Sequence, residues 1–308
     1  MEKLICNLFE ENLIPVSEIA MLKTSGNISY LIKSQNNKYI LRLCGAERRF
    51  RCKNEVLSEI CLLKFLNKSK FPVPKLVSFK GNELISLRNR NGICYSYVEG
   101  EVLNNCKENH CYELGLFLSN LHNTTVNFSI PFERKKWDLD TTKELFSELE
   151  EFFKENCFLK SNNFSERIKS ILLNLNFSVD LPSGAIHEDL GMRHVIFKKE
   201  KISCVIDWDR FYKGYFVLDL GQAIRGWCFD DWKILNKQKL NSLLYGYTSI
   251  RELTSLEKEF LYDAVRFAFV ERIISFALHG IKTNDEKLLR YAVEDLELVN
   301  NFDKNDFS

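Results

Sequence analysis

Two aspartates flank a short apolar hairpin in the second half of the chain. Asp189 precedes the strand-like run Val195 to Phe197, and Asp207 follows the second apolar run, Ile202 to Ile206. One carboxylate can accept the proton of an attacking hydroxyl, and a second can hold magnesium on nucleotide phosphates. Because a hairpin folds back on itself, we expect both carboxylates to lie at one end of the sheet. The pattern predicts phosphoryl transfer from a nucleotide.

A single cation interrupts an apolar strand in the first half of the chain. Arg42 lies within Tyr-Ile-Leu-Arg-Leu, with apolar neighbours on both sides. A cation on a buried strand normally has a fixed partner, and Glu59 on the following predicted helix is the candidate. Kinases use such a pair to hold nucleotide phosphates. A purely structural ion pair is the alternative interpretation.

A turn of small polar residues, Thr24 to Tyr30, precedes this strand. Its one glycine and several hydroxyl groups can present hydrogen-bond donors to phosphates. The same composition is also typical of ordinary turns, so this feature alone does not identify a phosphate site.

Composition limits the class of protein. A chain of 308 residues with 45% hydrophobic residues and 24 Phe suits two packed domains. A net charge of +1 and a pI near 7.5 argue against a nucleic-acid-binding surface. The densest basic run, Arg48, Arg49, Arg51 and Lys53, is interpreted as a solvated loop before a helix.

The ten cysteines include no Cys-x-x-Cys pair and no zinc-finger spacing with His. They lie mostly in apolar runs, for example at Cys61, Cys94 and Cys204, so we expect buried thiols in a reducing cytosol. The N-terminus lacks an apolar signal region, and no run reaches the length of a membrane span. These features predict a cytoplasmic protein without a membrane or nucleic-acid partner.

The first hundred residues read mainly as strands around one helix. The predicted strands are Met21 to Lys23, Ser29 to Lys33, Tyr39 to Leu43, Glu83 to Leu87 and Ile93 to Val98. Turns are predicted at Asn36-Asn37 and at Arg88 to Gly92, and Glu99 to Glu101 is interpreted as a linker. The helix is expected from about Asn54 to Asn67, and Pro72 and Pro74 follow it.

After residue 100 helical periodicity dominates. The predicted helices are His110 to His122, Thr141 to Phe153, Phe164 to Leu175, Phe216 to Trp227, Leu256 to Leu278 and Asp285 to Val299. The sequence therefore predicts an α+β protein with an N-terminal nucleotide-binding lobe, residues 1–98, and a mainly helical catalytic and substrate-binding lobe, residues 99–308.

With these motifs in place, the chain resembles the aminoglycoside phosphotransferase-like kinases, which have a protein kinase-like two-lobe fold, and most closely the type II homoserine kinases. The resemblance runs nearly end to end. The matching motifs are Ser25 to Tyr30, Lys38 to Arg42, Glu59 with Phe71 to Pro74, Tyr97 to Glu101, Leu114 to His122, His187 to Leu190, Val205 to Trp208, and Asp219-Leu220 with Gly226 to Cys228.

The resemblance implies a role for each site residue and implies ATP and Mg²⁺ as cofactors. Asp189 would be the catalytic base, and Asp207 would bridge the metal to the phosphates. The residues implied in nucleotide binding are Ser25, Gly26, Asn27 and Ser29 in the turn, Arg42 held by Glu59, and the backbone of Tyr97, Val98 and Glu99 at the adenine.

Supporting roles follow from the same resemblance. His187 is expected to fix the catalytic loop, and Asp219 to brace it. Asp209 is either a surface charge or a substrate contact. Arg42 stands where protein kinases carry Lys, and no Ala-Pro-Glu segment follows Asp207, so a protein kinase is disfavoured.

One position departs from the family pattern. His194 occupies the place of the Asn that would be a second metal ligand. Imidazole can bind a divalent metal, whereas magnesium prefers oxygen ligands. Three interpretations stay open: one firmly and one loosely held magnesium, a preference for Mn²⁺, or loss of activity with nucleotide binding retained.

The predicted function is ATP-dependent phosphorylation of a small-molecule hydroxyl, with homoserine as the first acceptor and aminoglycosides, aminosugars, amino alcohols and sugars as alternatives. The acceptor pocket is expected between the catalytic loop and the helices after residue 215. Trp227, Asp230, Asp231 and Trp232 are candidates there, with surface packing as the alternative for each. The rival function is a catalytically weak or inactive nucleotide-binding pseudokinase with a regulatory role.

Overall fold

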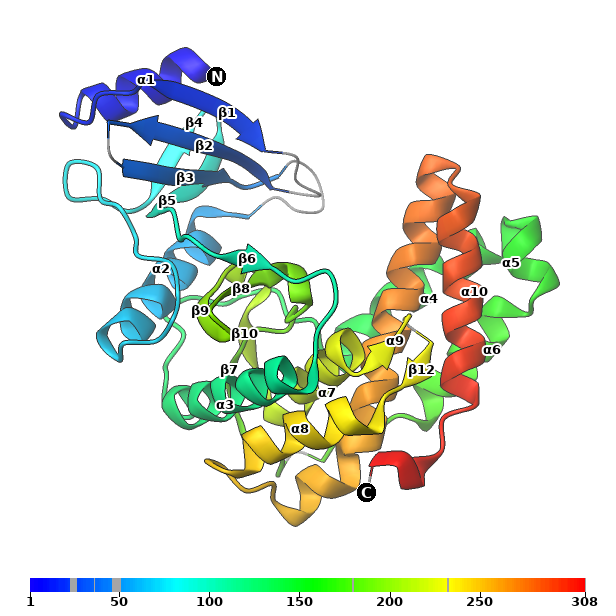
Figure 1. Ribbon diagram of the computed structural model, residues 1–308. Coiled ribbons are helices and arrows are strands. Elements are labelled where there is room, and N and C mark those ends of the chain that lie inside the picture. The colour runs from blue at the N-terminus through cyan, green and yellow to red at the C-terminus, as the bar shows by residue number, and fades with distance from the viewer. Residues whose placement is uncertain (23–26, 36, 46–50, 179, 232, 308) are drawn as a thin grey trace. The chain divides into compact units, whose positions relative to one another are not determined.

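The computed structural model describes residues 1–22, 27–35, 37–45, 51–178, 180–231 and 233–307 (Figure 1). Its contacts divide the chain into two compact units. The first comprises Met1–Leu103, Ser129–Arg134 and His194–Asp209, and the second comprises Asn104–Phe128, Lys135–Arg193 and Arg210–Ser308. The first unit is rich in strands and the second in helices, in agreement with the predicted α+β class. The predicted lobe division at residues 98 and 99 stays a prediction.

A five-stranded antiparallel sheet forms the centre of the first unit. Its strands are β1 (Glu18–Leu22), β2 (Ile28–Ser34), β3 (Asn37–Leu43), β4 (Ile85–Leu87) and β5 (Arg90–Ser96), in the order β1-β2-β3-β5-β4. Helix α1 (Glu2–Glu10), which the sequence reading did not predict, buries Ile5 and Phe9 in the same core as Leu41. The Phe9 ring packs edge-on against Tyr39 and Phe79.

The turn between β4 and β5 is shorter than predicted. Only Arg88 and Asn89 adopt left-handed conformations, with φ of 47° and 62°, so β5 already begins at Arg90. Two left-handed residues match the twist of antiparallel strands. The earlier start places Gly92 within β5, where a Cβ atom would lie 2.2 Å from the Arg42 carbonyl oxygen. Glycine therefore permits β5 to approach β3 at Arg42.

Helix α2 (Lys53–Lys68) agrees with the predicted helix to within one residue at each end. It buries Val56, Ile60 and Leu63 together with the polar Glu59. The prediction that Cys61 is buried is wrong, because this residue points outward from the helix and is exposed, whereas Cys94 and Cys204 are buried as predicted. An apolar run thus overestimates burial when only one helix face packs.

A three-stranded sheet completes the first unit, with strand order β6 (Glu101–Val102), β8 (Val195–Lys198) and β9 (Lys201–Val205). The predicted hairpin is thereby confirmed, and Lys199 and Glu200 form its left-handed turn. The predicted linker ends in the short strand β6, which pairs Glu101 with Phe197.

The second unit contains the helices that follow residue 103. They are α3 (Glu108–Thr125), α4 (Leu139–Glu155), α5 (Cys157–Ser161), α6 (Phe164–Asn174), α7 (Phe216–Trp227), α8 (Lys237–Thr248), α9 (Ser255–Thr283) and α10 (Glu286–Asn300). All six predicted helices are confirmed, whereas α5 and α8 were not predicted. Two strand pairs complete the unit: β7 (Ser183–Ile186) with β10 (Tyr212–Tyr215), and β11 (Phe229–Asp230) with β12 (Ile234–Leu235).

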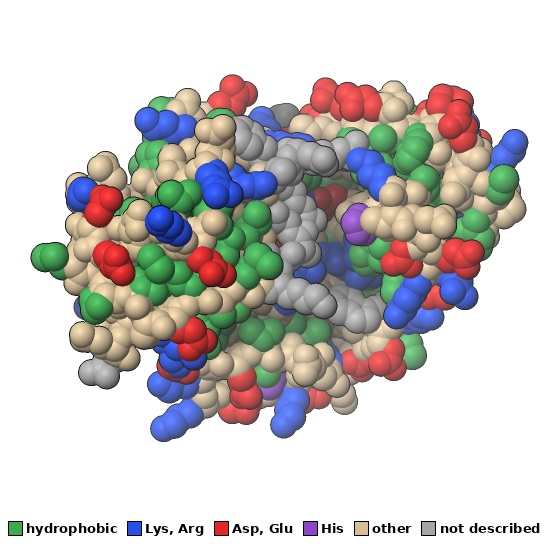
Figure 2. Space-filling model, turned by 90° about the horizontal axis from the view of Figure 1, so that it is seen from above, with side chains coloured by type: hydrophobic (Ala, Val, Ile, Leu, Met, Phe, Trp, Pro, Cys, Tyr) green, Lys and Arg blue, Asp and Glu red, His purple; other side chains and the backbone are tan. Residues whose placement is uncertain are grey.

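In the described part of the chain, no helix combines enough length with enough apolar character to cross a bilayer. Basic and acidic side chains are interspersed over the face seen in Figure 2.

Helices α3 and α8 approach each other through glycines. A Cβ atom at Gly115 would lie 2.1 Å from the carbonyl oxygen of Leu243, and one at Gly246 would lie 2.3 Å from that of Tyr112. Backbone atoms cannot rotate away as a flexible side chain can, so both helices need these glycines to pack.

We therefore expect Gly115→Ala to separate α3 from α8 and to lower the free energy of unfolding by at least about 1–3 kcal/mol. Thermal denaturation should show a midpoint several degrees below that of the wild type. Asn123→Ala, at an exposed position on α3, is the matched control. Equal midpoints for the two variants would show that α3 and α8 can move apart without loss of stability.

Candidate active site

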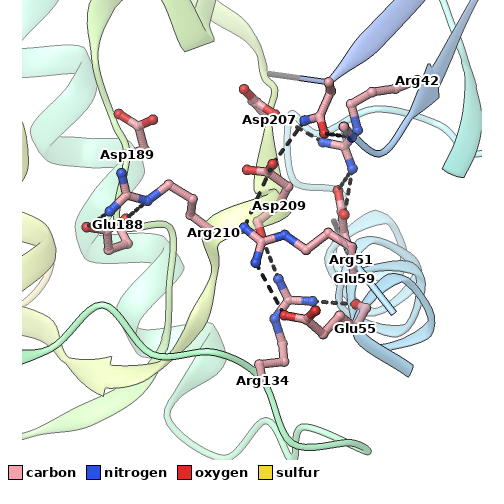
Figure 3. Close-up of polar contacts among 12 residues, drawn as sticks. Arg42, Arg51, Glu55, Glu59, Arg134, Glu188, Asp189, Asp207, Asp209 and Arg210 are labelled. Carbon is pink, nitrogen blue, oxygen red and sulfur yellow. Dashed lines mark hydrogen bonds and ion pairs between the residues drawn. The ribbon is translucent and has the colours of Figure 1, made fainter. Parts of the chain in front are cut away.

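In the first unit, a buried cation on β3 holds the segment that follows β9. The Nη2 atom of Arg42 donates to both carboxylate oxygens of Glu59 at 2.6 Å, and Nη1 donates to Asp207 Oδ1 at 3.1 Å (Figure 3). The predicted pairing of Arg42 with Glu59 is confirmed. Burial alone would lower the pKa of Arg42, but Glu59 and then Asp207 raise it well above its usual range. The guanidinium therefore stays charged.

Asp207 lies two residues beyond β9 in a left-handed conformation, with φ of 65°. Its Oδ2 atom is 3.4 Å from Nε2 of His194, and the Ile206 N–H donates to the His194 carbonyl at 2.8 Å. The two predicted metal-binding residues are therefore neighbours within one unit. About a third of the Asp207 side chain is exposed, which leaves its carboxylate accessible to a ligand.

The residues present fit a divalent cation that is also bound by phosphates. Within the described ranges, no group of three or more His, Cys, Asp or Glu side chains could enclose a metal. Magnesium commonly uses only one or two carboxylates and takes its other ligands from substrate phosphates and water. Asp207 with His194 is sufficient for that mode of binding and insufficient for an all-protein metal site.

Asp209 is not a surface charge, because its side chain is only 13% exposed. Its Oδ2 atom accepts a hydrogen bond from Asn27 Nδ2 at 2.9 Å and lies 4.0 Å from Arg51 Nη2 (Figure 3). Asn27 of the predicted nucleotide-binding turn is thus tied to the segment that carries Asp207. Ser29 lies opposite Arg42 in the β2–β3 register, whereas Ser25 and Gly26 are outside the described residues.

The interpretation of the basic run as a solvated loop is wrong for Arg51. This side chain is buried because two carboxylates lie next to it. Glu55, in the first turn of α2, is 3.3 Å from Arg51, and Asp209, after β9, is 4.0 Å from it. Lys53 is exposed as predicted. Arg48 and Arg49 are outside the described residues.

Sequence reasoning missed Arg134. Its guanidinium donates to the backbone carbonyls of Glu55 and of Asp209, the latter at 2.5 Å, and so connects α2 with the Asp207 segment (Figure 3). Burial lowers its pKa to about 10. No motif surrounds Arg134 in the sequence, so only the fold identifies it.

The predicted adenine-binding segment extends the edge of β5. The Tyr97 N–H donates to the Lys38 carbonyl at 2.9 Å and is therefore already engaged in the sheet. Lys38 pairs with Glu99 at 2.9 Å and lies 5.1 Å from the centroid of the Tyr97 ring. No such backbone hydrogen bond is found for Val98 or Glu99 among the described residues, so their peptide groups are available to a base.

In the second unit, the carboxylate of Asp219 on α7 holds the loop that contains Asp189. It accepts hydrogen bonds from the N–H groups of His187 at 3.0 Å and Glu188 at 2.8 Å. The predicted bracing role of Asp219 is confirmed. His187 is fully buried, and its Nδ1 atom accepts from the Asp189 N–H at 3.2 Å, which confirms its loop-fixing role.

Within this loop, adjacent acidic residues have different environments. Glu188 has a left-handed backbone, with φ of 74°, and its buried carboxylate contacts Arg210 and Gln222. The Asp189 carboxylate points away from that of Glu188 (Figure 3). It lies 3.1 Å from Nη2 of the exposed Arg193. Asp189 is therefore the carboxylate of the loop with an exposed, displaceable partner.

The remaining candidates for the acceptor pocket have different environments. Trp227 is not a surface residue, because it is buried and its Nε1 atom donates to the Leu190 carbonyl at 2.6 Å. Asp230 pairs with Lys239 at 2.6 Å and accepts from Asn236 at 2.7 Å. Asp231 is exposed, and Trp232 is outside the described residues.

Comparison with known proteins identifies relatives of this arrangement. The model of the phosphotransferase enzyme family, APH, matches residues 23–253. The homoserine kinase of Bartonella henselae is 27% identical over 235 residues, covering 75% of this chain and 71% of that protein. The homoserine kinase of Agrobacterium fabrum is 28% identical over 238 residues, covering 76% and 71%.

Solved structures confirm the predicted kinase-like fold. A microcompartment-associated aminopropanol kinase superimposes with a TM-score of 0.71 at 19% identity, covering 99% of this chain and 98% of that one. An amicoumacin kinase solved with AMP-PNP and Ca²⁺ superimposes with a TM-score of 0.73 at 17% identity, covering 100% and 97%.

Asp219 is itself held by a buried histidine. His122 Nε2 lies 3.2 Å from Asp219 Oδ2, His122 Nδ1 lies 2.7 Å from the Tyr247 hydroxyl, and the imidazole stacks on Phe216. Burial lowers the pKa of His122, although Asp219 opposes this effect. Burial would raise the pKa of Asp219, but hydrogen bonding and charge from His122 lower it. A neutral imidazole beside an ionised carboxylate follows at neutral pH.

Because His122 binds a proton less readily in the folded than in the unfolded chain, stability should fall as the pH drops below about 6.5. Titration of His122 can change the free energy of unfolding by at most about 1.4 kcal/mol per pH unit. Urea denaturation between pH 8 and 5 would measure it. His122→Asn should flatten the dependence, whereas His279→Gln at an exposed position should retain it. An unchanged slope in His122→Asn would exclude His122 as its origin.

Proposed function

The chain belongs to the phosphotransferase enzyme family and is a small-molecule kinase, and we propose that it transfers the γ-phosphoryl group of ATP to the hydroxyl of homoserine or a similar small alcohol. The observation that carries the proposal is the pairing of Arg42 with both Glu59 and Asp207. This arrangement places a fixed cation next to the predicted metal ligand.

Asp189 is proposed to position the acceptor hydroxyl and to accept its proton as the new phosphate ester bond forms. Its N–H is held by His187 and its loop by Asp219, so the carboxylate has a defined direction before substrate binds. Such pre-orientation removes entropic cost from the reacting complex. The exposed Arg193 partner would have to release Asp189 for this step.

Arg42 is proposed to bind phosphate oxygens of the nucleotide while Glu59 keeps its guanidinium in place. Asp207 and His194 would hold the divalent cation, which supplies neutralisation of phosphate charge when bound. Backbone groups around Val98 would bind the adenine, and Asn27 would link the nucleotide turn to the Asp207 segment through Asp209.

The competing proposal is a nucleotide-binding protein with little or no catalytic activity. His194 motivates it, because an imidazole occupies the place of an oxygen ligand and lies against Asp207. Measuring ATP binding with Mg²⁺ and with Mn²⁺, together with phosphorylation of a panel of small alcohols, separates the two. Binding without transfer to any acceptor would favour the non-catalytic protein.

Asp189→Asn should abolish phosphoryl transfer and leave ATP affinity nearly unchanged, because an amide cannot accept the hydroxyl proton and does not contact phosphate. General-base catalysis contributes about 10²–10⁴-fold, so kcat should fall by at least that range. Coupled assays of ADP release and calorimetric ATP titration measure the two quantities. Asp180→Asn, an exposed position in the same unit, is the control, and wild-type kcat in Asp189→Asn would refute the role.

His194→Asn should maintain or raise kcat and shift the metal preference from Mn²⁺ toward Mg²⁺, because an amide oxygen replaces a ring nitrogen. The ratio of kcat in Mg²⁺ to kcat in Mn²⁺ is the measurement, and His279→Asn at an exposed site is the control. Complete loss of transfer in His194→Asn would instead show that the imidazole has a specific function.

A further inference from the structure

The last turn of α7 packs against the loop that carries Asp189. Trp227 Nε1 donates to the Leu190 carbonyl at 2.6 Å. A Cβ atom at Gly226 would lie 3.5 Å from both the Leu190 carbonyl oxygen and the Gly191 Cα atom. Arg225 immediately precedes these two contacts, so its backbone has a fixed position beside the catalytic loop.

Arg225 differs from the neighbouring arginines in its partner. Its Nε and Nη2 atoms donate to Gln222 Oε1 at 3.2 and 2.8 Å, and no carboxylate of the described residues lies within ion-pair distance. Other partly buried arginines of this unit each have a carboxylate: Arg210 with Glu188 and Glu271, Arg251 with Glu257, Arg266 with Asp263, and Arg272 with Asp295.

Gln222 separates Arg225 from the nearest acidic side chains. Its Nε2 atom donates to Glu188 Oε1 at 3.2 Å and to Glu271 Oε2 at 2.8 Å. Both carboxylates also contact Arg210. They are therefore already engaged by Arg210 and Gln222, and among the described residues the Arg225 guanidinium donates its hydrogen bonds to the neutral amide of Gln222.

The surroundings of Arg225 disfavour its positive charge unless an anion binds next to it. Burial and, after it, the positive charge of Arg272 lower the pKa of Arg225 to about 10, whereas the charges of Asp189, Glu271 and Glu188 act in the opposite direction. A cation that is partly removed from water and has no carboxylate in direct contact is less stable than one in an ion pair. A bound carboxylate would supply the missing charge.

The loop is open on the side of Gly191. A Cβ atom at Gly191 would have no described atom within 4 Å. Gly191 lies two residues beyond Asp189, and its Cα atom would lie 3.5 Å from a Cβ atom at Gly226, the residue that follows Arg225. Asp189 and Arg225 therefore lie on the two segments that meet at this open position.

We infer that Arg225 binds the carboxylate of the acceptor, and that the acceptor is a short hydroxy acid, such as a hydroxy-amino acid, rather than a polycationic aminosugar. This inference rests on the proposed function, in which the acceptor places its hydroxyl at Asp189. Arg225 would bind the carboxylate of the same acceptor. A guanidinium suits the role since its planar donors match the two oxygens of a carboxylate.

The test compares L-homoserine with 3-aminopropan-1-ol, which keeps the amine and the primary hydroxyl but lacks the carboxylate. The wild type should prefer homoserine. Arg225→Met should lower kcat/KM for homoserine roughly 10- to 100-fold, mainly through KM, and leave that for 3-aminopropan-1-ol unchanged. Arg225→Lys should retain part of the preference, and Arg290→Met, exposed on α10, should retain all of it.

Calorimetric titration of homoserine and of 4-hydroxybutyrate into the wild type and Arg225→Met gives a readout that does not depend on phosphoryl transfer. Binding that requires Arg225 without any transfer would refute the proposed activity and support the carboxylate site. Equal losses for both acceptors in Arg225→Met, no wild-type preference for homoserine, or no binding of either acid would overturn the inference.

Discussion

A charge removed from water has to be paired, and this requirement organises both units. In the first unit, Arg42 joins α2 to the segment after β9 through Glu59 and Asp207, groups 17 and 165 residues away in the chain. In the second unit, Asp219 joins α7 to the loop that precedes Asp189. Since removing one member of a buried pair leaves the other uncompensated, each arrangement holds a functional segment at a fixed place.

The supporting residues extend these pairs and fix their geometry. Arg134 donates from its guanidinium to the backbone carbonyls of Glu55 and Asp209 and so fixes the course of the backbone at both residues. His122 holds the Asp219 carboxylate in a similar way, at the oxygen that also accepts from the His187 N–H. Both residues act on groups that orient the site and have no need to contact a substrate.

The sequence allowed the prediction of features with a local signature. Periodic apolar residues revealed α2 and six helices of the second unit, and the position of Arg42 in an apolar strand was enough to suggest Glu59 as its partner. It did not reveal α1, α8 or Arg134, because their placement follows from contacts between distant segments. Cys61 and Arg51 were misassigned for the same reason: burial depends on which face a helix presents and on which carboxylates lie nearby.

The order in which the chain builds the two units limits how the protein can be divided. The polypeptide passes from one unit to the other five times, after residues 103, 128, 134, 193 and 209. A fragment that ends at residue 103 would keep Arg42 and Glu59 but would lack Asp207 and Arg134. Each unit consists of three separate segments of the chain, so neither can be moved into another protein as one continuous piece. Exchange of a whole unit between related proteins would require the chain to be cut and rejoined at several places at once.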